Sequence, residues 1–241
     1  MISLRPQTNG RSNSMRSALL GLVALFATTA PALHAQTAAP AAKAPIVVEM
    51  FTSKFCPSCP MAESKLKSVA NENPDLLVVF SHVDYWDRSP KQKDPFGLPE
   101  LTQRQYDVAA SLGRRPGEVF TPMPVLDGQI MAKPPLLFSW GSSLDEARQL
   151  PAKPALAVRK TADGDVEIDI PAALYGANRE IWVLGLLPIE GSKANTVGGI
   201  AEGQMKTGTV RIPHALLPKG EKMLVLLQEV GPGKVVAVGQ L

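Results

Sequence analysis

The sequence predicts an α/β protein in two parts: strands and helices alternate in the first part, and the second part consists of strands. Two apolar runs rich in β-branched residues, 46–52 and 76–83, flank a segment whose apolar residues recur at helical spacing. This pattern indicates a β-α-β unit with parallel strands. After Pro151 the helical spacing disappears, and short runs such as the alternating Val166–Ile170 take its place. Such runs are typical of antiparallel sheets.

The first part continues with further elements of both kinds. A helix is expected over Glu100–Leu112, and Asp127-Gly128 between two apolar pairs predicts a β-hairpin. The capping box Ser143-Leu-Asp-Glu146 predicts the start of a last short helix, Leu144–Leu150. The order β-α-β-α-β-β-α is that of the thioredoxin fold, which we therefore expect over residues 46–152.

The second part, residues 153–241, is expected to form a small antiparallel β-sandwich-like domain. It contains no cysteine and a single histidine, His214, so its sequence offers no catalytic constellation. The expected strands cover residues 155–160, 166–170, 181–187, 209–212, 223–230 and 235–238.

The N-terminus has the three parts of a secretory signal peptide. Arginines precede the apolar run Ala18–Ala27, and small residues follow it. A run of about ten residues is too short to span a bilayer, which takes about 20. We predict a signal peptide over residues 1–35, a low-complexity linker over residues 36–45, and a periplasmic or secreted protein that keeps no membrane segment.

The charge of the chain argues against a nucleic-acid partner. Three of the 25 basic residues lie in the expected signal peptide, and 22 acidic residues oppose the rest. The folded part is therefore close to neutral and lacks the excess of Lys and Arg that nucleic-acid surfaces carry.

Cys56 and Cys59 are the two cysteines of the chain, and they are three residues apart. Loop-closure entropy gives a disulfide this short roughly 2 kcal/mol of stabilisation, against about 3 for a 15-residue loop. Redox or metal chemistry is therefore favoured over a structural disulfide. The pair lies between a strand and a helix, where the helix N-terminus stabilises a thiolate. We expect Cys56 to attack and Cys59, more buried, to resolve.

Polar residues at two other places are candidates for the same site. Parallel strands end at one edge of a sheet, so Cys56 and His82–Asp87 (HVDYWD) should be neighbours. His82, Asp84 and Trp86 are candidate substrate-binding residues, with a structural histidine as the alternative for His82. Glu49 interrupts the first apolar run. It either faces solvent at an edge or is a buried carboxylate with a raised pKa that relays the Cys59 proton.

FTSKFCPSCP at Phe51–Pro60 and HVDYWD at His82–Asp87 resemble a family of secreted bacterial thioredoxin-like proteins classed as a domain of unknown function. The resemblance spans roughly residues 46–128. Two features depart from the family pattern: Pro57 lies inside the cysteine pair, and Met123-Pro124 follows Pro122. The other matching stretches are Lys93–Phe96, Arg104–Tyr106 and Thr121–Gly128.

The resemblance to thioredoxins implies a cis Thr121–Pro122 bond facing the disulfide, where both residues would hold a substrate segment. The expected function is a thiol–disulfide oxidoreductase or redox partner that acts, without a cofactor, on protein thiols or disulfides of the cell envelope. Two alternatives stay open. A non-enzymatic binding module would use the disulfide structurally. A copper-handling protein would bind Cu(I) through Cys56, Cys59, Met61, Met123 and His82.

Overall fold

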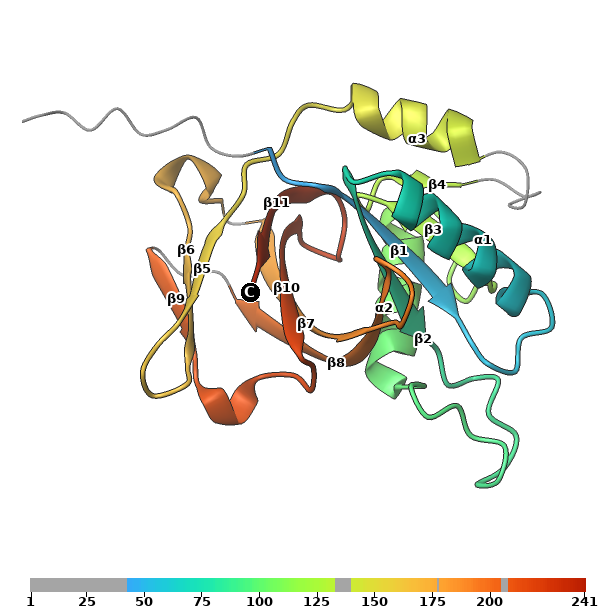
Figure 1. Ribbon diagram of the computed structural model, residues 1–241. Coiled ribbons are helices and arrows are strands. Elements are labelled where there is room, and N and C mark those ends of the chain that lie inside the picture. Colours follow the sequence, from blue (N-terminus) through green and yellow to red (C-terminus); the bar gives the residue numbers. More distant parts are fainter. Residues whose placement is uncertain (1–42, 133–139, 177, 205–207) are drawn as a thin grey trace, which may run out of the picture. The chain divides into compact units, whose positions relative to one another are not determined.

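The protein is a mixed α/β structure with one large and one small sheet (Figure 1). The computed structural model describes residues 43–132, 140–176, 178–204 and 208–241, which all lie in one compact unit, residues 39–241. The large sheet has eight strands in the order β11-β10-β7-β8-β2-β1-β3-β4, and the small one has the order β5-β6-β9.

The expected signal peptide, residues 1–35, and most of the expected linker, residues 36–45, lie outside the described residues. Within the described part, none of the helices has both the length and the apolar character that a membrane span requires.

The β-α-β unit at the start of the fold is the one that the apolar pattern predicts. Strand β1 (Ile46–Thr52) and strand β2 (Leu76–His82) are parallel, in a register that runs to the pair Thr52 and His82. Helix α1 (Cys59–Glu72) joins them and buries its apolar stripe. The stripe packs on the β1 face that carries Val48 and Met50. Both strands thus end side by side at one edge of the sheet.

The next elements also follow the predicted order. They are α2 (Pro99–Ser111), β3 (Met123–Leu126), β4 (Ile130–Met131) and α3 (Trp140–Gln149). Strand β3 is antiparallel to β1. The turn between β3 and β4 places Asp127 and Gly128 at φ values of 49° and 66°, the left-handed conformation that Asp-Gly turns adopt.

The capping-box prediction for the last helix is wrong. Helix α3 begins at Trp140, so Ser143 lies inside it. Trp140, Leu144 and Ala147 are its buried residues. Burial of Trp140 on the same face as Leu144 extends the helix by one turn before the polar residues that resembled a cap.

Four strands of the second part extend the large sheet and do not form a sheet of their own. They are β7 (Arg179–Pro188), β8 (Asn195–Gln204), β10 (Lys222–Glu229) and β11 (Val235–Gln240). Strand β8 pairs with β2 in parallel through Val79 and Phe80. The sheet therefore crosses the expected boundary between residues 152 and 153. Whether residues 46–152 fold alone stays a prediction.

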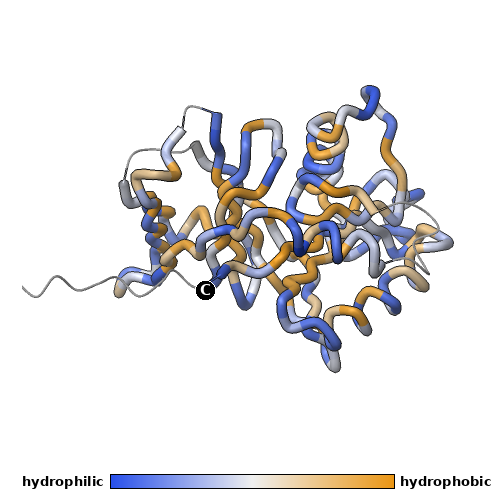
Figure 2. Tube along the Cα trace, turned by 90° about the horizontal axis from the view of Figure 1, so that it is seen from above, coloured by the Kyte–Doolittle hydropathy of each residue, from blue (hydrophilic) through white to orange (hydrophobic). Residues whose placement is uncertain are grey.

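The small antiparallel sheet contains β5 (Ala157–Lys160), β6 (Val166–Asp169) and β9 (Thr209–Ile212). Its buried residues Val166 and Ile168 share an apolar cluster with Ile181 of β7 and Val225 of β10. The two sheets thus face each other in this part of the protein. Figure 2 shows that many hydrophobic stretches of the chain lie inside the fold, whereas hydrophilic stretches are frequent at its periphery. Two short 3₁₀ helices, Ala172–Leu174 and His214–Leu216, follow β6 and β9.

Candidate functional site

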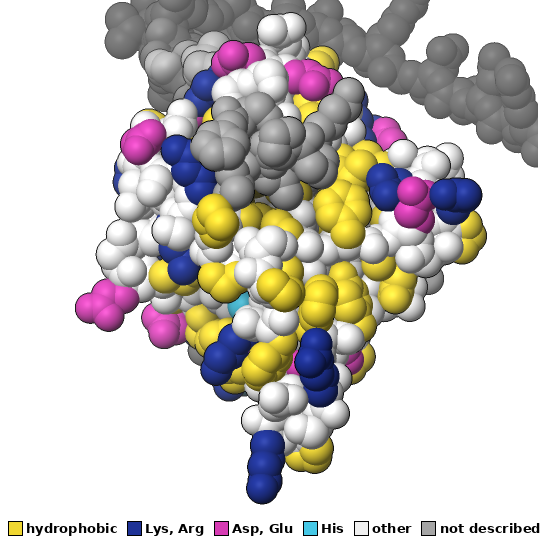
Figure 3. All heavy atoms as spheres, turned by 90° about the vertical axis from the view of Figure 1, so that its right-hand side faces the viewer, with side chains coloured by type: hydrophobic (Ala, Val, Ile, Leu, Met, Phe, Trp, Pro, Cys, Tyr) yellow, Lys and Arg dark blue, Asp and Glu magenta, His cyan; other side chains and the backbone are white. Residues whose placement is uncertain are grey.

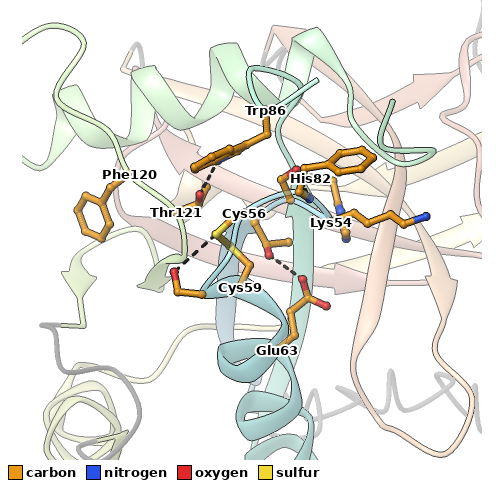
Figure 4. Close-up of a disulfide and its surroundings, with 12 residues drawn as sticks. Lys54, Cys56, Cys59, Glu63, His82, Trp86, Phe120 and Thr121 are labelled. Atoms are coloured by element: carbon orange, nitrogen blue, oxygen red, sulfur yellow. Dashed lines mark hydrogen bonds between the residues drawn. A yellow bond between two sulfur atoms is a disulfide. The ribbon is translucent and has the colours of Figure 1, made fainter. Parts of the chain in front are cut away.

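Cys56 and Cys59 form a disulfide where β1 leads into α1 (Figure 4). Their Cα atoms are 5.4 Å apart. Helix α1 begins at Cys59 with Ser58 as its N-cap residue. Cys56 lies three residues earlier, in the turn, and its carbonyl accepts a hydrogen bond of 3.3 Å from the amide of Cys59. The sulfur of Cys56 is therefore held just outside the first turn of the helix.

Burial does not distinguish the two cysteines, contrary to the expectation that Cys59 is the more buried. Cys56 is 1% exposed and Cys59 is 0% exposed. What distinguishes them is a hydroxyl: Ser58 Oγ lies 3.7 Å from Cys56 Sγ (Figure 4). In the reduced protein this hydroxyl is placed to donate to a Cys56 thiolate, which favours the charged form.

A buried carboxylate, Asp94, ties the disulfide turn to the segment after β2. Its Oδ2 accepts hydrogen bonds from the backbone amide of Lys54 at 2.6 Å and from Ser53 Oγ at 3.4 Å. The same oxygen lies 2.9 Å from Nδ1 of His82. Its Oδ1 accepts a bond of 3.0 Å from the amide of Phe96.

The charge of Asp94 follows from these contacts. Burial acts to raise its pKa, but the hydrogen bonds from His82 and from the amide of Lys54 prevail and lower the pKa to about 2. The carboxylate is therefore ionised at neutral pH. An ionised carboxylate only accepts hydrogen bonds, so the shared proton lies on Nδ1 of His82.

Trp86 and Thr121 close the opposite side of the disulfide. The indole Nε1 of Trp86 donates a hydrogen bond of 2.8 Å to Oγ1 of Thr121 (Figure 4). The Thr121–Pro122 peptide bond is cis, as the resemblance implied. Pro122 is buried and directly precedes β3, whose Met123 pairs with Phe51 of β1. Figure 4 shows Cys56, Cys59, His82, Trp86 and Thr121 around the same edge of the sheet, and Pro122 follows Thr121 in the chain.

Asp84 makes its described hydrogen bonds with α2. The Thr102 hydroxyl donates a hydrogen bond of 2.5 Å to Oδ1 of Asp84. The backbone amide of Asp84 donates a second bond, of 3.0 Å, to Oγ1 of Thr102. Thr102 lies in the first turn of α2. The contacts of Asp84 therefore fasten the segment after β2 to a helix and do not reach the disulfide.

Glu49 is buried, which removes the solvent-facing alternative. Its Oε2 lies 2.9 Å from Nη2 of Arg104, its Oε1 lies 3.0 Å from Nε of the same side chain, and Ser81 Oγ donates to Oε1 at 2.8 Å. Arg104 also donates to Oε1 of Gln228 at 2.8 Å. Alternation along β1 places Glu49 on the face opposite Val48 and Met50, which α1 covers. Its hydrogen bonds reach neither cysteine, so the contacts support an ion pair that joins β1, α2 and β10.

Apart from the Cys56–Cys59 disulfide, no described contact joins the residues expected to bind Cu(I) in the alternative function. Met61 is 60% exposed on α1, whereas Met123 is fully buried in a cluster with Val108 of α2. Across the described ranges, no group of three or more His, Cys, Asp or Glu side chains is arranged to hold a metal ion.

Two residues of the site escaped the reasoning from sequence. Ser58 lies inside the cysteine motif but gives no signal of its own. Asp94 lies in the charged segment after β2, and the only pointer to it was the stretch Lys93–Phe96 of the family resemblance. Its partners Lys54 and His82 are 40 and 12 residues away, a separation that no local pattern reveals.

Comparison with known protein families identifies the family that the sequence resembles. The family described as "Protein of unknown function (DUF1223)" matches residues 47–211, more than half of the chain. The chain is 47% identical to a thioredoxin of Methanocaldococcus jannaschii over 34 residues, 14% of this chain. That match spans 40% of the length of the thioredoxin.

Two solved structures share the fold. An X-ray crystal structure of an Agrobacterium tumefaciens protein has a TM-score of 0.62 and 27% identity, and the alignment covers 83% of this chain and 95% of that one. HBP35 of Porphyromonas gingivalis has a TM-score of 0.54 at 14% identity, with 83% and 75% of the two chains covered. The second likeness concerns the fold alone.

Proposed function

Because this chain belongs to the DUF1223 family of proteins of unknown function, we propose its function from the site itself: an exported, thioredoxin-like thiol–disulfide oxidoreductase, or the redox partner of one. Its reacting group is the Cys56–Cys59 pair, and its partners are protein thiols or disulfides of the cell envelope. The N-terminal sequence, with its signal-peptide pattern over residues 1–35, supports export to the periplasm or the medium.

The observation that carries the proposal is the disulfide at the start of α1, in a β1-α1-β2 unit whose neighbour β3 directly follows Pro122. The proposal is supported by the local sheet order β2-β1-β3-β4, with β1 parallel to β2 and antiparallel to β3, an order that thioredoxin-like folds also have. The 34-residue match to a thioredoxin supports the same assignment. Thr121 and Pro122 would then hold a substrate segment beside the sulfurs.

The proposed reaction is thiol–disulfide exchange in two steps. In the reducing direction the Cys56 thiolate attacks one sulfur of a partner disulfide. A mixed disulfide forms, and the other sulfur of the partner leaves as a thiolate that takes up a proton. The Cys59 thiolate then attacks Cys56 Sγ, the Cys56–Cys59 bond forms, and the partner leaves reduced by two electrons. The oxidising direction is the reverse and starts from the disulfide present in the structure.

Two groups near the pair, the Ser58 hydroxyl and the Asp94 carboxylate, have supporting roles in this proposal. The hydroxyl of Ser58 would stabilise the Cys56 thiolate across the 3.7 Å contact. Asp94 would fix the turn through Ser53 and Lys54. A fixed turn keeps the sulfur aligned for in-line attack, since exchange depends on access and geometry as well as on the thiolate fraction.

The reduction potential of the pair tests this proposal. The protein is equilibrated in glutathione and dithiothreitol buffers of known potential, free thiols are blocked, and the oxidised fraction is read by mass. We expect a potential between about −120 and −270 mV, the range of exchange proteins. The double variant Cys56→Ser/Cys59→Ser is the control, because it has no thiol to block and its mass should not change with the potential of the buffer. A potential below about −300 mV, typical of a structural disulfide, would contradict a redox role.

A further inference from the structure

We infer that the face around the disulfide docks a polypeptide whose reacting cysteine lies among apolar and acidic residues. This inference rests on the proposed function and goes further by stating the chemistry of the partner. The docking face comprises the exposed parts of three segments: the disulfide turn with the start of α1 (residues 54–61), the segment after β2 (residues 84–98), and the loop that ends at Thr121.

The docking face is unusually apolar for a free surface. Six large hydrophobic side chains are exposed in the described part of the chain, and three of them, Met61, Tyr85 and Phe96, belong to this face at 60%, 40% and 37% exposure. Phe55, Trp86 and Phe120 are half-buried around them. Figure 3 shows hydrophobic side chains spread across this side of the molecule. Exposed apolar patches of this kind mark interaction sites.

The aromatic side chains of the face are held in place before a partner arrives. The ring of Phe96 lies 5.5 Å from that of His82, which Asp94 fixes. The ring of Tyr85 lies 6.4 Å from that of Trp86, and Trp86 is bonded to Thr121. Rigid aromatic groups lose little conformational entropy on binding, so they suit a docking surface.

In the segment after β2 the negative side chains make hydrogen bonds within the protein, whereas the positive side chains are exposed to solvent. Its three carboxylates are used internally: Asp84 bonds Thr102, Asp87 accepts from the amide of Asp94, and Asp94 holds the disulfide turn. Its cationic side chains are exposed, and so is Lys54 in the disulfide turn. The exposed cations of the docking face are thus Lys54, Arg88, Lys91 and Lys93. None of these four makes an ion pair with any side chain in the described ranges.

An acidic polypeptide is the occupant that these observations favour. Lys and Arg side chains lie at the lower end of the apolar area in Figure 3. Four unpaired positive charges beside an apolar surface complement a segment that carries both apolar and acidic side chains. The formal charges of the segment after β2 balance, with three of each sign, but the side chains that it exposes to a partner are the cationic ones. Opposite charges raise the rate of encounter as well as the affinity.

Three model peptides test the inference. Each carries one cysteine as a mixed disulfide with thionitrobenzoate, flanked by Leu and by either Glu, Lys or Ser residues. Release of the coloured thiolate by the reduced protein gives a second-order rate constant. We expect the Glu peptide to react at least about tenfold faster than the Lys peptide at low ionic strength, and the ratio to fall at higher salt.

Charge-reversal variants locate the effect. Arg88→Glu/Lys91→Glu/Lys93→Glu should invert the preference for the Glu peptide over the Lys peptide. The matched control reverses three exposed cations of the other half, Lys160→Glu/Lys219→Glu/Lys222→Glu, and should leave the preference unchanged. For the apolar part, Tyr85→Ser should slow all three peptides, and the control Leu216→Ser, at a residue that is 65% exposed, should not.

The outcomes separate this inference from the proposed function. Equal rates for the three peptides, or a preference that both triple variants change alike, would overturn the inference and leave the redox function intact. No reaction with any peptide would contradict the proposed function. Cosedimentation with phosphatidylglycerol vesicles, lost in Arg88→Glu/Lys91→Glu/Lys93→Glu, together with equal peptide rates would assign the face to anionic lipid instead.

Discussion

The carboxylate of Asp94 lies 2.6 Å from the backbone amide of Lys54, although the two residues are 40 positions apart in the sequence. Lys54 opens the turn that leads to Cys56, and Asp94 belongs to the segment after β2. A single ionised side chain thus holds together the two segments that flank the disulfide. The geometry of the cysteine pair therefore depends on a residue that no cysteine motif includes.

Asp94→Asn should lower the free energy of unfolding, and the size of this decrease should depend on pH. The pKa of Asp94 falls from its usual 3.8 to about 2 in the folded protein. A carboxyl group of this kind stabilises the folded protein fully at a pH above the pKa that it has in the unfolded chain. This stabilisation is lost as the pH falls through the pKa that the group has in the folded protein. We expect the variant to lose about 2 kcal/mol of unfolding free energy at pH 7, and less as the pH approaches 2.

Urea unfolding of both proteins between pH 7 and pH 2 measures this difference. Asp163→Asn is the control, because the Asp163 side chain is 80% exposed in the turn between β5 and β6. A difference between Asp94→Asn and the native protein that stays constant over this pH range would show that the charge of Asp94 does not stabilise the fold.

Ser58→Ala should raise the pKa of the Cys56 thiol in the reduced protein. The hydroxyl 3.7 Å from Cys56 Sγ can donate to the thiolate, and its removal takes away a hydrogen bond to a charged group. Such a bond contributes about 1.5 kcal/mol, roughly one pKa unit. The pH dependence of iodoacetamide alkylation reports the pKa. The control is Ser64→Ala, at an exposed position of α1; equal alkylation profiles for the two variants would count against the contact.

Glu49→Gln separates an ion pair from a proton relay. Loss of one partner of a buried pair leaves Arg104 uncompensated, so we expect a loss of about 3–5 kcal/mol in unfolding free energy with no change in the Cys56 thiol pKa. Glu49→Leu/Arg104→Met removes both charges and should recover much of that stability. A changed thiol pKa at unchanged stability would instead favour the relay.

The elements nearest the site could be predicted because their signals are local. The β-branched run of β1, the apolar stripe of α1 and the Asp-Gly turn each lie within one short stretch of sequence. Strand β8 could not be predicted, because its glycines weaken the strand pattern. The structure gives the reason for Gly199: a Cβ there would lie 2.7 Å from the backbone of Lys219, so the close approach of another segment requires glycine.

The parts of the site that escaped prediction depend on long-range partners. Arg104 is hydrogen-bonded to Glu49, which is 55 residues away in the sequence, and to Gln228, which is 124 residues away. A carboxylate in an apolar run looks the same whether it pairs with an arginine or relays a proton. The edge that the cysteines share with His82 and Trp86 was predictable, because parallel strands fix it regardless of the intervening sequence.

Trapping of a mixed disulfide tests the central claim most directly. Cells that export Cys59→Ser, Cys56→Ser or the double variant are quenched with acid, thiols are blocked, and the envelope fraction is run on non-reducing gels with mass spectrometry of shifted bands. We expect Cys59→Ser to accumulate mixed disulfides through Cys56, because the thiol that resolves the intermediate is missing, and Cys56→Ser to trap nothing, like the double variant. Equal trapping by both single variants would contradict the assigned roles, and no trapping by either would contradict thiol–disulfide exchange at this pair.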